Sequence, residues 1–299
     1  MSTTTKLIFG CGYLGQRVAE RWKNSGHRVT IITRSAERAQ EFRRTGYEAI
    51  VADITKSESL RQLPKAETVL YSVGYDRKST TPGSSIEEVY AGGVRHVLAA
   101  LDSNVSRFIY ISTTGVYGAG DGDWVDETTP TDPQRDGGRA SLAAEQLLAA
   151  SSLKTRGVIL RLAGLYGPGR VPFLDELHRG EPIPAISTGY LNLIYVDDAA
   201  DVVVAAAKFD PKDFLTTNPG PRIYCASDGH PVERGEYYSE VARQIGMPPP
   251  SFIAPNPNSP RAQRAASSRR ISNERMLNEL RVTLAYPDYR CGLTASLGA

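Results

Sequence analysis

The first thirty-four residues constrain the fold of this chain more than any other part of its sequence. An apolar run at 7–9 precedes the turn GCGYLG at 10–15, an amphipathic stretch follows, and a second apolar run, HRVTIITR, ends at Arg34. This order of strand, glycine turn, helix and strand is typical of a βαβ unit that binds the phosphates of a dinucleotide. The contacts expected in the turn are Gly10, Cys11, Gly12, Tyr13, Leu14 and Gly15.

The three glycines of this turn have separate expected roles. Gly10 permits the tight bend, Gly12 leaves no Cβ between the backbone and a pyrophosphate, and Gly15 lets the helix approach the sheet. The N-terminus of the following helix offers unpaired N–H donors to the anion. The alternative interpretation is a glycine turn in a sheet that holds no ligand.

Short apolar runs rich in β-branched residues alternate with helical patterns through the first two-thirds of the chain, which indicates a parallel sheet flanked by helices. We expect strands at 5–9, 28–33, 48–52, 68–73, 107–112, 157–162 and 222–226. A crossover helix at 84–102 is predicted to bury one face that includes Ile86, Val89, Tyr90 and Val94. Further helices are expected at 138–151 and 198–208. The predicted fold class is α/β, a Rossmann-type doubly wound parallel sheet.

The length of 299 residues predicts a second, smaller part beside the nucleotide-binding domain. Prolines at 168, 172, 182 and 184 break the alternating pattern, and after 227 a helix leads into the proline-rich stretch MPPPSFIAPNPNSP. We therefore expect a dinucleotide-binding domain at 1–165, to which 196–226 returns, and a mixed α/β substrate lobe at 166–195 and 227–299. The arginine-rich segment 261–270 is interpreted as a solvated loop or as a contact to a substrate phosphate.

The composition points to small-molecule partners. A net charge of +2, with acidic and basic residues mixed along the chain, favours neither nucleic acid nor a membrane surface as partner. Three distant cysteines, Cys11, Cys225 and Cys291, indicate a reducing, cytoplasmic setting without disulfides. No run approaches the ~20 apolar residues of a membrane span. The four histidines show no metal-ligand spacing, so we expect no metal.

The residues beyond the second strand favour NADP over NAD. An Asp or Glu at this place would accept hydrogen bonds from the adenosine ribose and repel a 2′-phosphate, but the chain has Thr33, Arg34 and Ser35. The Arg34 guanidinium can hold a 2′-phosphate with charge-assisted hydrogen bonds, unless it only decorates the start of a helix. Further expected contacts are Asp53 and Ile54 after the third strand and Gly74 after the fourth. Asp53 is alternatively a helix cap.

With these residues placed, the chain resembles the extended short-chain dehydrogenase/reductases, a superfamily branch of epimerases and dehydratases. The landmarks, in order, are ISTTGVYG at 111–118, VDETTP at 125–130, SLAAEQLL at 141–148, RLAGLYGPGR at 161–170, NLIYVDDAA at 192–200 and ISNERMLNEL at 271–280. The resemblance extends over nearly the whole chain and is most specific to an atypical bacterial subgroup, the YeeZ-like proteins. It implies an NAD(P)-dependent oxidoreductase and a homodimer formed through the helices at 84–102 and 138–151.

The chain departs from that family where its catalytic pair is expected. The resemblance implies a Tyr and a Lys four residues apart at the start of the helix that contains SLAAEQLL, but these positions are Gly137 and Ser141. Neither residue type occurs anywhere in 125–153. Thr113 matches the family's hydroxyl that hydrogen-bonds the substrate, or it only caps the end of a strand. The first glycine of the family's turn is also replaced, by Phe9.

Several side chains are candidates for the missing chemistry, and each has a structural alternative. For proton transfer we consider Tyr117, which alternatively packs in a turn, and Glu127, which alternatively lies in a solvated loop. Arg139 is a candidate for an anion contact or a surface residue. Tyr166 can stack on a substrate, and Arg170 can bind its phosphate or carboxylate. Asp197 and Asp198 are expected to cap a helix.

Three functions follow from these features. The first is an NADP-binding oxidoreductase of the epimerase/dehydratase kind, with Thr113, Tyr117 and Glu127 as catalytic candidates, acting on a small sugar-nucleotide or phosphorylated substrate. The second is a non-catalytic sensor of NADP(H), favoured by the missing Tyr and Lys. The third is a protein whose cofactor serves only as a structural brace.

Overall fold

The computed structural model describes residues 4–75, 84–118, 120–208, 220–256 and 268–298. The chain forms two compact units. Unit 1 consists of Met1–Val116, Asp136–Arg161 and Ala200–Tyr224, and unit 2 consists of Tyr117–Arg135, Leu162–Ala199 and Cys225–Ala299. Residues 117–135 thus belong to unit 2, whereas the sequence interpretation assigned them to the dinucleotide-binding domain. Most of the arginine-rich segment 261–270 lies outside the described residues.

Within the described residues, unit 1 is built on a seven-stranded sheet in the order β12-β7-β5-β4-β1-β2-β3. Its strands are β1 (Thr5–Phe9), β2 (Arg28–Thr33), β3 (Glu48–Val51), β4 (Thr68–Tyr71), β5 (Arg107–Thr113), β7 (Gly157–Leu162) and β12 (Arg222–Ala226). The neighbours from β3 to β5 pair in parallel. Each of the seven begins at the residue that the sequence predicts, so the expected doubly wound α/β fold is confirmed.

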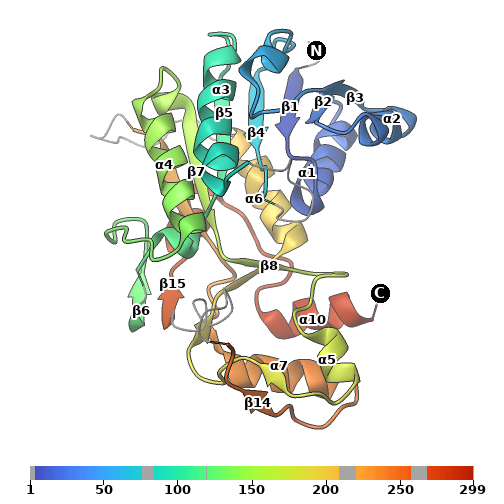
Figure 1. Ribbon diagram of the computed structural model, residues 1–299, viewed down its shortest axis with the longest axis vertical. Helices are drawn as coiled ribbons and strands as arrows, with labels where there is room; N and C mark the ends of the chain where they lie inside the picture. Colours follow the sequence, from blue (N-terminus) through green and yellow to red (C-terminus); the bar gives the residue numbers. More distant parts are fainter. Residues whose placement is uncertain (1–3, 76–83, 119, 209–219, 257–267, 299) are drawn as a thin grey trace. The chain divides into compact units, whose positions relative to one another are not determined.

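Helices cover both faces of this sheet, so its inner strands are apolar on both sides. They are α1 (Tyr13–Asn24), α2 (Ala36–Arg44), α3 (Gly93–Ala100), α4 (Asp136–Ala150) and α6 (Val196–Lys208), with short helical turns at η1 (Ser57–Leu60), η3 (Thr114–Val116) and η4 (Lys154–Arg156). Leu7, Ile8 and Phe9 of β1 are fully buried. Figure 1 shows α3 and α4 side by side. Helix α6 starts in unit 2 and ends in unit 1.

The crossover helix departs from regular α-helical geometry. It contains a π turn, η2 (Glu88–Gly92), directly before α3. The hydroxyl of Tyr71 on β4 donates to the carbonyl of Val89 inside this turn, at 2.8 Å. A Cβ on Gly93 would lie 2.2 Å from the same hydroxyl, so only glycine fits there. The buried phenol therefore accounts for a local rearrangement of the helix.

Unit 2 is made of short elements. They are β6 (Asp121–Val125), β8 (Gly164–Tyr166), α5 (Leu174–His178), β9 (Ile183–Pro184), β10 (Tyr190–Leu191), β11 (Leu193–Tyr195), β13 (Val232–Glu233), α7 (Arg234–Gln244), β14 (Phe252–Ile253), β15 (Ser268–Ile271), α9 (Glu274–Leu280) and α10 (Tyr289–Leu297). Distant stretches of sequence pair here, since β6 lies parallel to β15 and β9 parallel to β14. Among the described residues, no helix is long and apolar enough to cross a membrane.

Candidate dinucleotide and active site

The glycine turn after β1 forms an open cradle at the start of α1. A Cβ on Gly10, which has φ +85°, would lie 2.5 Å from the carbonyl oxygen of Ser72, and a Cβ on Gly15 would lie 2.5 Å from that of Gly10. Packing therefore requires glycine at both positions. At Gly12 a Cβ would meet nothing within 4 Å, and α1 has no side-chain cap there. Open backbone and uncapped N–H groups fit the pyrophosphate of a dinucleotide.

The other residues of the turn support its shape. Leu14 and Cys11 are buried, and burial raises the pKa of the Cys11 thiol to about 12, against a smaller opposing effect of Arg38. This thiol therefore holds its proton at neutral pH. The ring of Tyr13 lies under the Arg17 guanidinium, 4.5 Å from its carbon. Cys11 and Leu14 are thus packed inside unit 1, whereas the backbone at Gly12 faces open space.

The residues beyond β2 bring several polar groups to one corner of unit 1. Thr33 ends the strand, and Ser35 caps α2 by accepting the N–H of Arg38 at 3.1 Å. The Arg38 guanidinium donates to the carbonyl of Cys11 at 3.0 Å and so joins this corner to the glycine turn. Arg34 is exposed beside it. One carboxylate, Glu37, also lies here and accepts the Ser35 hydroxyl.

The segments after β3 and β4 complete the expected cofactor contacts. Asp53 accepts the N–H and the hydroxyl of Thr55 through one oxygen, so it shapes an Asx turn and does not cap a helix. The carbonyl of Ile54 pairs with Nδ1 of His96 at 2.8 Å. Gly74 is exposed, and a Cβ there would meet nothing within 4 Å. All of the expected cofactor contacts thus lie in unit 1.

Thr113 occupies the carboxyl end of β5. Its hydroxyl oxygen accepts the N–H of Gly115 at 3.0 Å, which is the local cap that the sequence offers as an alternative role. Accepting that bond leaves the hydroxyl proton available to a ligand. Both roles are therefore compatible with the geometry.

Helix α4 carries Gly137 and Ser141 at its start. Ser141 is buried and hydrogen-bonds the phenol of Tyr110. One turn further along, Glu145 forms a buried ion pair with Arg161 at 2.6 Å and accepts the hydroxyl of Ser112 at 2.5 Å. These contacts fasten α4 to β5 and β7.

The start of α4 also carries Arg139, whose side chain is more than half exposed. Arg139 pairs with Asp136 in the first turn of the helix. This ion pair is the surface arrangement that the sequence allows for Arg139.

In unit 2, the two candidates for proton transfer, Tyr117 and Glu127, both contact Cys225. The Tyr117 hydroxyl lies 3.1 Å from the Cys225 sulfur and is buried. One oxygen of Glu127 accepts the Cys225 N–H at 2.7 Å, and the other lies 3.5 Å from Nε of Arg275. The Glu127 side chain is only 3% exposed, so it is not the solvated loop residue of the alternative interpretation. A role for either group in proton transfer stays a prediction.

The two candidate substrate contacts have different surroundings. Tyr166 is buried, and its hydroxyl packs against Gly292 of α10, where a Cβ would lie 2.0 Å away. Its ring meets the Tyr195 ring edge to face. Arg170 is exposed in a turn closed by its own N–H and the Gly167 carbonyl. Exposure leaves Arg170 accessible to a ligand, whereas stacking of Tyr166 on a substrate stays a prediction.

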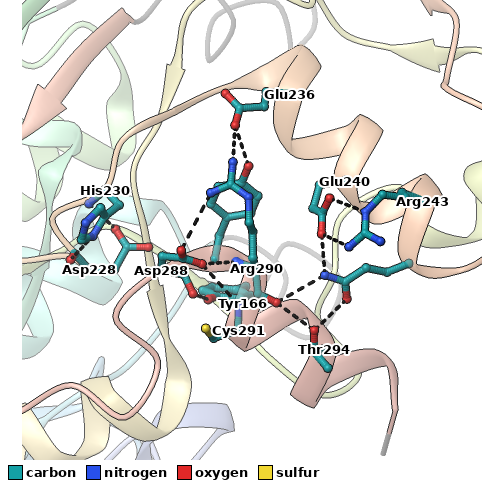
Figure 2. A network of polar contacts seen from close by, with 12 residues as sticks. Tyr166, Asp228, His230, Glu236, Glu240, Arg243, Asp288, Arg290, Cys291 and Thr294 are labelled. Carbon is teal, nitrogen blue, oxygen red and sulfur yellow. Dashed lines mark hydrogen bonds and ion pairs between the residues drawn. The ribbon is translucent and has the colours of Figure 1, made fainter.

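A second polar cluster in unit 2 surrounds α10 (Figure 2). Glu236 of α7 pairs with Arg290 and accepts the Tyr289 hydroxyl, while Asp288 caps α10. Asp198 accepts the N–H groups of Ala285 and Tyr286 and so anchors the distant carboxyl-terminal segment, while its expected role as a cap of α6 stays a prediction. Sequence patterns gave no signal for these pairings because the partners lie far apart in the chain.

Asp228 is the most perturbed carboxyl of the described residues. It is 4% exposed, one oxygen accepts the His230 N–H, and the other has no partner among the described residues. Burial, followed by the charges of Asp288 and Asp198, raises the pKa of Asp228 to about 8. This carboxyl therefore holds its proton near neutral pH.

The chain is similar to known proteins over most of its length. A family model described as the NAD dependent epimerase/dehydratase family matches residues 7–215. The Escherichia coli K12 protein YeeZ is 29% identical over 290 residues, which cover 94% of this chain and 96% of YeeZ. The Vibrio cholerae UDP-glucose 4-epimerase is 30% identical over 275 residues, which cover 86% of this chain and 80% of that enzyme.

A solved structure agrees with the sequence relatives. The structure from Methylobacillus flagellatus, described as a candidate NAD-dependent epimerase/dehydratase, has a TM-score of 0.77 and 29% identity, covering 99% of this chain and 98% of that one. The glycine turn of unit 1 lies within the matched range of the family model. The chain therefore belongs to the NAD-dependent epimerase/dehydratase family.

Proposed function

We propose that this chain is an NADP-dependent oxidoreductase that acts on a small sugar-nucleotide or phosphorylated sugar. The observation that carries the proposal is the cradle at Gly12, where open backbone meets the uncapped start of α1. When bound, the nicotinamide supplies or accepts a hydride. Thr113 positions the oxygen of the reacting carbon through its hydroxyl proton, because its own oxygen is occupied by Gly115.

The corner beyond β2 supports NADP rather than NAD. Arg34 is exposed directly beyond β2, the Arg38 guanidinium reaches the Cys11 carbonyl, and Ser35 adds a hydroxyl. Two guanidinium groups favour the two negative charges of a 2′-phosphate. The sequence interpretation did not include Arg38, because its contact with the Cys11 carbonyl joins segments that are 27 residues apart. Glu37 opposes this preference, and its hydrogen bond to Ser35 directs it along the helix cap.

Calorimetry on the Arg34→Asp variant tests the cofactor preference. We expect NADP to bind about tenfold to a hundredfold more weakly, since a charged hydrogen bond contributes ~1.5–3 kcal/mol, while NAD binding changes little. Arg44→Asp, at the opposite end of the same helix, is the matched control for the change in net charge. Equal losses for both cofactors in Arg34→Asp contradict a contact between Arg34 and the 2′-phosphate.

The substrate class rests on the relatives and on one exposed side chain. The V. cholerae relative is named for its action on UDP-glucose, and Arg170 of unit 2 is an exposed cation suited to a phosphate. A panel of sugar nucleotides, hexose phosphates and aldehydes, followed by the absorbance of NADPH, identifies the substrate. We expect Thr113→Val to abolish any turnover found.

A non-catalytic sensor of NADP(H) is the second candidate, favoured by Gly137 and Ser141 at the start of α4. Such a protein binds NADPH tightly, oxidises it with no member of the panel, and captures a protein partner only when the cofactor is bound. Turnover with any carbonyl compound, lost in Thr113→Val, rules the sensor out.

A further inference from the structure

The hydroxyl of Tyr90 lies beside the segment that follows β4 in unit 1. Tyr90 is half-buried in the π turn η2, and its phenolic oxygen accepts the N–H of Tyr75 at 3.2 Å. Tyr75 directly follows Gly74, whose exposed backbone has open space where a Cβ would be. Because the phenol accepts this bond, its own proton remains available to donate.

Thr113 reaches the same edge from the neighbouring strand. β4 and β5 pair in parallel with Tyr71 opposite Tyr110, so three residues later the two chains arrive at Gly74 and Thr113. The sheet order reverses between β4 and β1, and ligands of such sheets bind at the carboxyl ends beside that point. Two hydroxyl groups that can each donate a proton are therefore brought to the cofactor side of the sheet.

The helix geometry turns Tyr90 toward this edge. Its two neighbours in the chain, Val89 and Ala91, are both buried, and the Tyr71 hydroxyl holds the turn through the Val89 carbonyl. π turns inserted in α-helices are frequent at functional sites. Without the inserted turn, the side chains on either side of it would have a different phase around the helix.

The crossover helix also faces the part of α4 that lacks a tyrosine and a lysine. A Cβ on Gly137 would lie 3.6 Å from the Ile86 side chain, and Ile86 precedes Tyr90 by one helical turn. Ser141, one turn beyond Gly137, hydrogen-bonds Tyr110, whose phenol interacts electrostatically with that of Tyr90. Tyr90 is thus the partly exposed phenol beside the helix start at Gly137.

We propose that Tyr90 is the proton donor of this active site. The step rests on the proposed oxidoreductase function and reduces a carbonyl group to an alcohol. The carbonyl carbon gains a hydride, for which NADPH is the source and is left oxidised, and the carbonyl oxygen gains the proton of the Tyr90 hydroxyl. The O–H bond of Tyr90 breaks as the new O–H bond forms, and water then returns a proton to the phenolate. Thr113 holds the same oxygen through a second hydrogen bond.

This role needs no lysine in the direction of reduction. A phenol in water loses its proton only near pH 10, so a tyrosine is protonated at neutral pH and can act as an acid toward a developing alkoxide. A nearby ammonium group matters for the reverse reaction, which begins from the phenolate. The absence of lysine from α4 therefore favours a reductase.

Absorbance titration of tyrosinate tests the placement of Tyr90 without any substrate. The oxidised nicotinamide ring is positively charged and stabilises a nearby phenolate, whereas the reduced ring is neutral. We expect one tyrosinate to form about one pH unit lower in the NADP⁺ complex than in the NADPH complex, and this difference to vanish in Tyr90→Phe. The matched control is Tyr75→Phe, because the Tyr75 hydroxyl donates to the Ser84 carbonyl. We expect this variant to keep the difference between the two complexes.

The surroundings of Tyr90 permit this measurement, because among the neighbouring titratable groups only tyrosines give the absorbance of tyrosinate when they lose a proton. The titratable groups on neighbouring elements and on its own helix are Tyr71, Tyr75, Tyr110, Asp136, Arg139, Glu145, Glu87, Glu88 and His96. Burial raises the pKa values of Tyr71 and Tyr110 well above that of an exposed phenol. Neither of these two buried phenols therefore titrates in the range of an exposed phenol.

The outcomes separate this inference from the cofactor proposal. A difference that persists in Tyr90→Phe, or is absent from wild-type protein that binds both cofactor forms by calorimetry, overturns the role of Tyr90 alone. Absence of binding to both forms overturns the cofactor proposal and this one with it. Tyr90→Asn replaces the Phe variant if circular dichroism shows that the latter does not fold.

Discussion

We expect two glycines of the same turn to respond differently to replacement by alanine. One substitution weakens cofactor binding, and the other lowers the stability of the fold. At Gly12, the new methyl group would meet nothing within 4 Å of its position, and φ is −98°, so we expect the free energy of unfolding to change by less than about 1 kcal/mol. The methyl group stands where a pyrophosphate would approach the start of α1. Loss of one charged hydrogen bond, ~1.5–3 kcal/mol, weakens cofactor binding about tenfold to a hundredfold.

Gly10→Ala is expected to lower stability. Its φ of +85° costs an alanine ~1–2 kcal/mol, and its Cβ would lie 2.5 Å from the Ser72 carbonyl oxygen, an overlap that costs a further ~1–3 kcal/mol. The total destabilisation is about 2–5 kcal/mol.

Urea denaturation and calorimetry with NADP measure the two effects separately. Gly12→Ala should retain wild-type stability with weakened binding, and Gly10→Ala should have a clearly reduced denaturation midpoint. Wild-type affinity in Gly12→Ala refutes the assignment of the pyrophosphate to this helix start. Unchanged stability in Gly10→Ala refutes the packing argument.

Three further predictions concern buried groups. Arg161→Met leaves the Glu145 carboxylate buried without its partner and should cost about 3–5 kcal/mol in urea denaturation, of which the double variant with Glu145→Leu regains most. Burial raises the pKa of Asp228 to about 8, so the folded chain holds a proton that the unfolded chain releases above pH ~4. The free energy of unfolding should therefore fall as pH rises from about 4 to 8. Denaturation at several pH values should show a smaller fall for Asp228→Asn. Gly93→Ala forces a methyl group against the Tyr71 hydroxyl and should lower the thermal midpoint, and an unchanged midpoint would show that the π turn adapts freely.

The fold was predictable from local patterns because the strands of the sheet are buried on both faces and read as short apolar runs. The run at 7–9 and the glycine turn specify β1 and the start of α1, and the same logic located the other strands of the sheet. The π turn was not predictable, because it depends on the phenol of Tyr71 reaching Val89 from another strand. The sequence interpretation therefore treated Tyr90 as part of a buried face.

The candidate site was predictable where one short segment builds it and not where distant segments meet. Gly10, Gly12 and Gly15 form the cradle within six residues, so their spacing carries the information. The environment of Glu127 depends on Cys225 and Arg275, which are about a hundred residues or more away, and periodicity in the sequence does not predict such contacts. Arg38 and Asp228 were missed for the same physical reason.

The order in which this chain leaves the ribosome has a consequence for its two units. The last stretch of unit 1 ends at Tyr224, whereas unit 2 needs residues up to the carboxyl-terminal helix. β6 can pair only when β15 has been synthesised, and two N–H donors of Asp198 come from Ala285 and Tyr286. Unit 1 can therefore assemble during translation, while unit 2 must wait until synthesis is nearly complete, and nascent chains that stop short of residue 285 lack the two N–H donors that Ala285 and Tyr286 supply to Asp198.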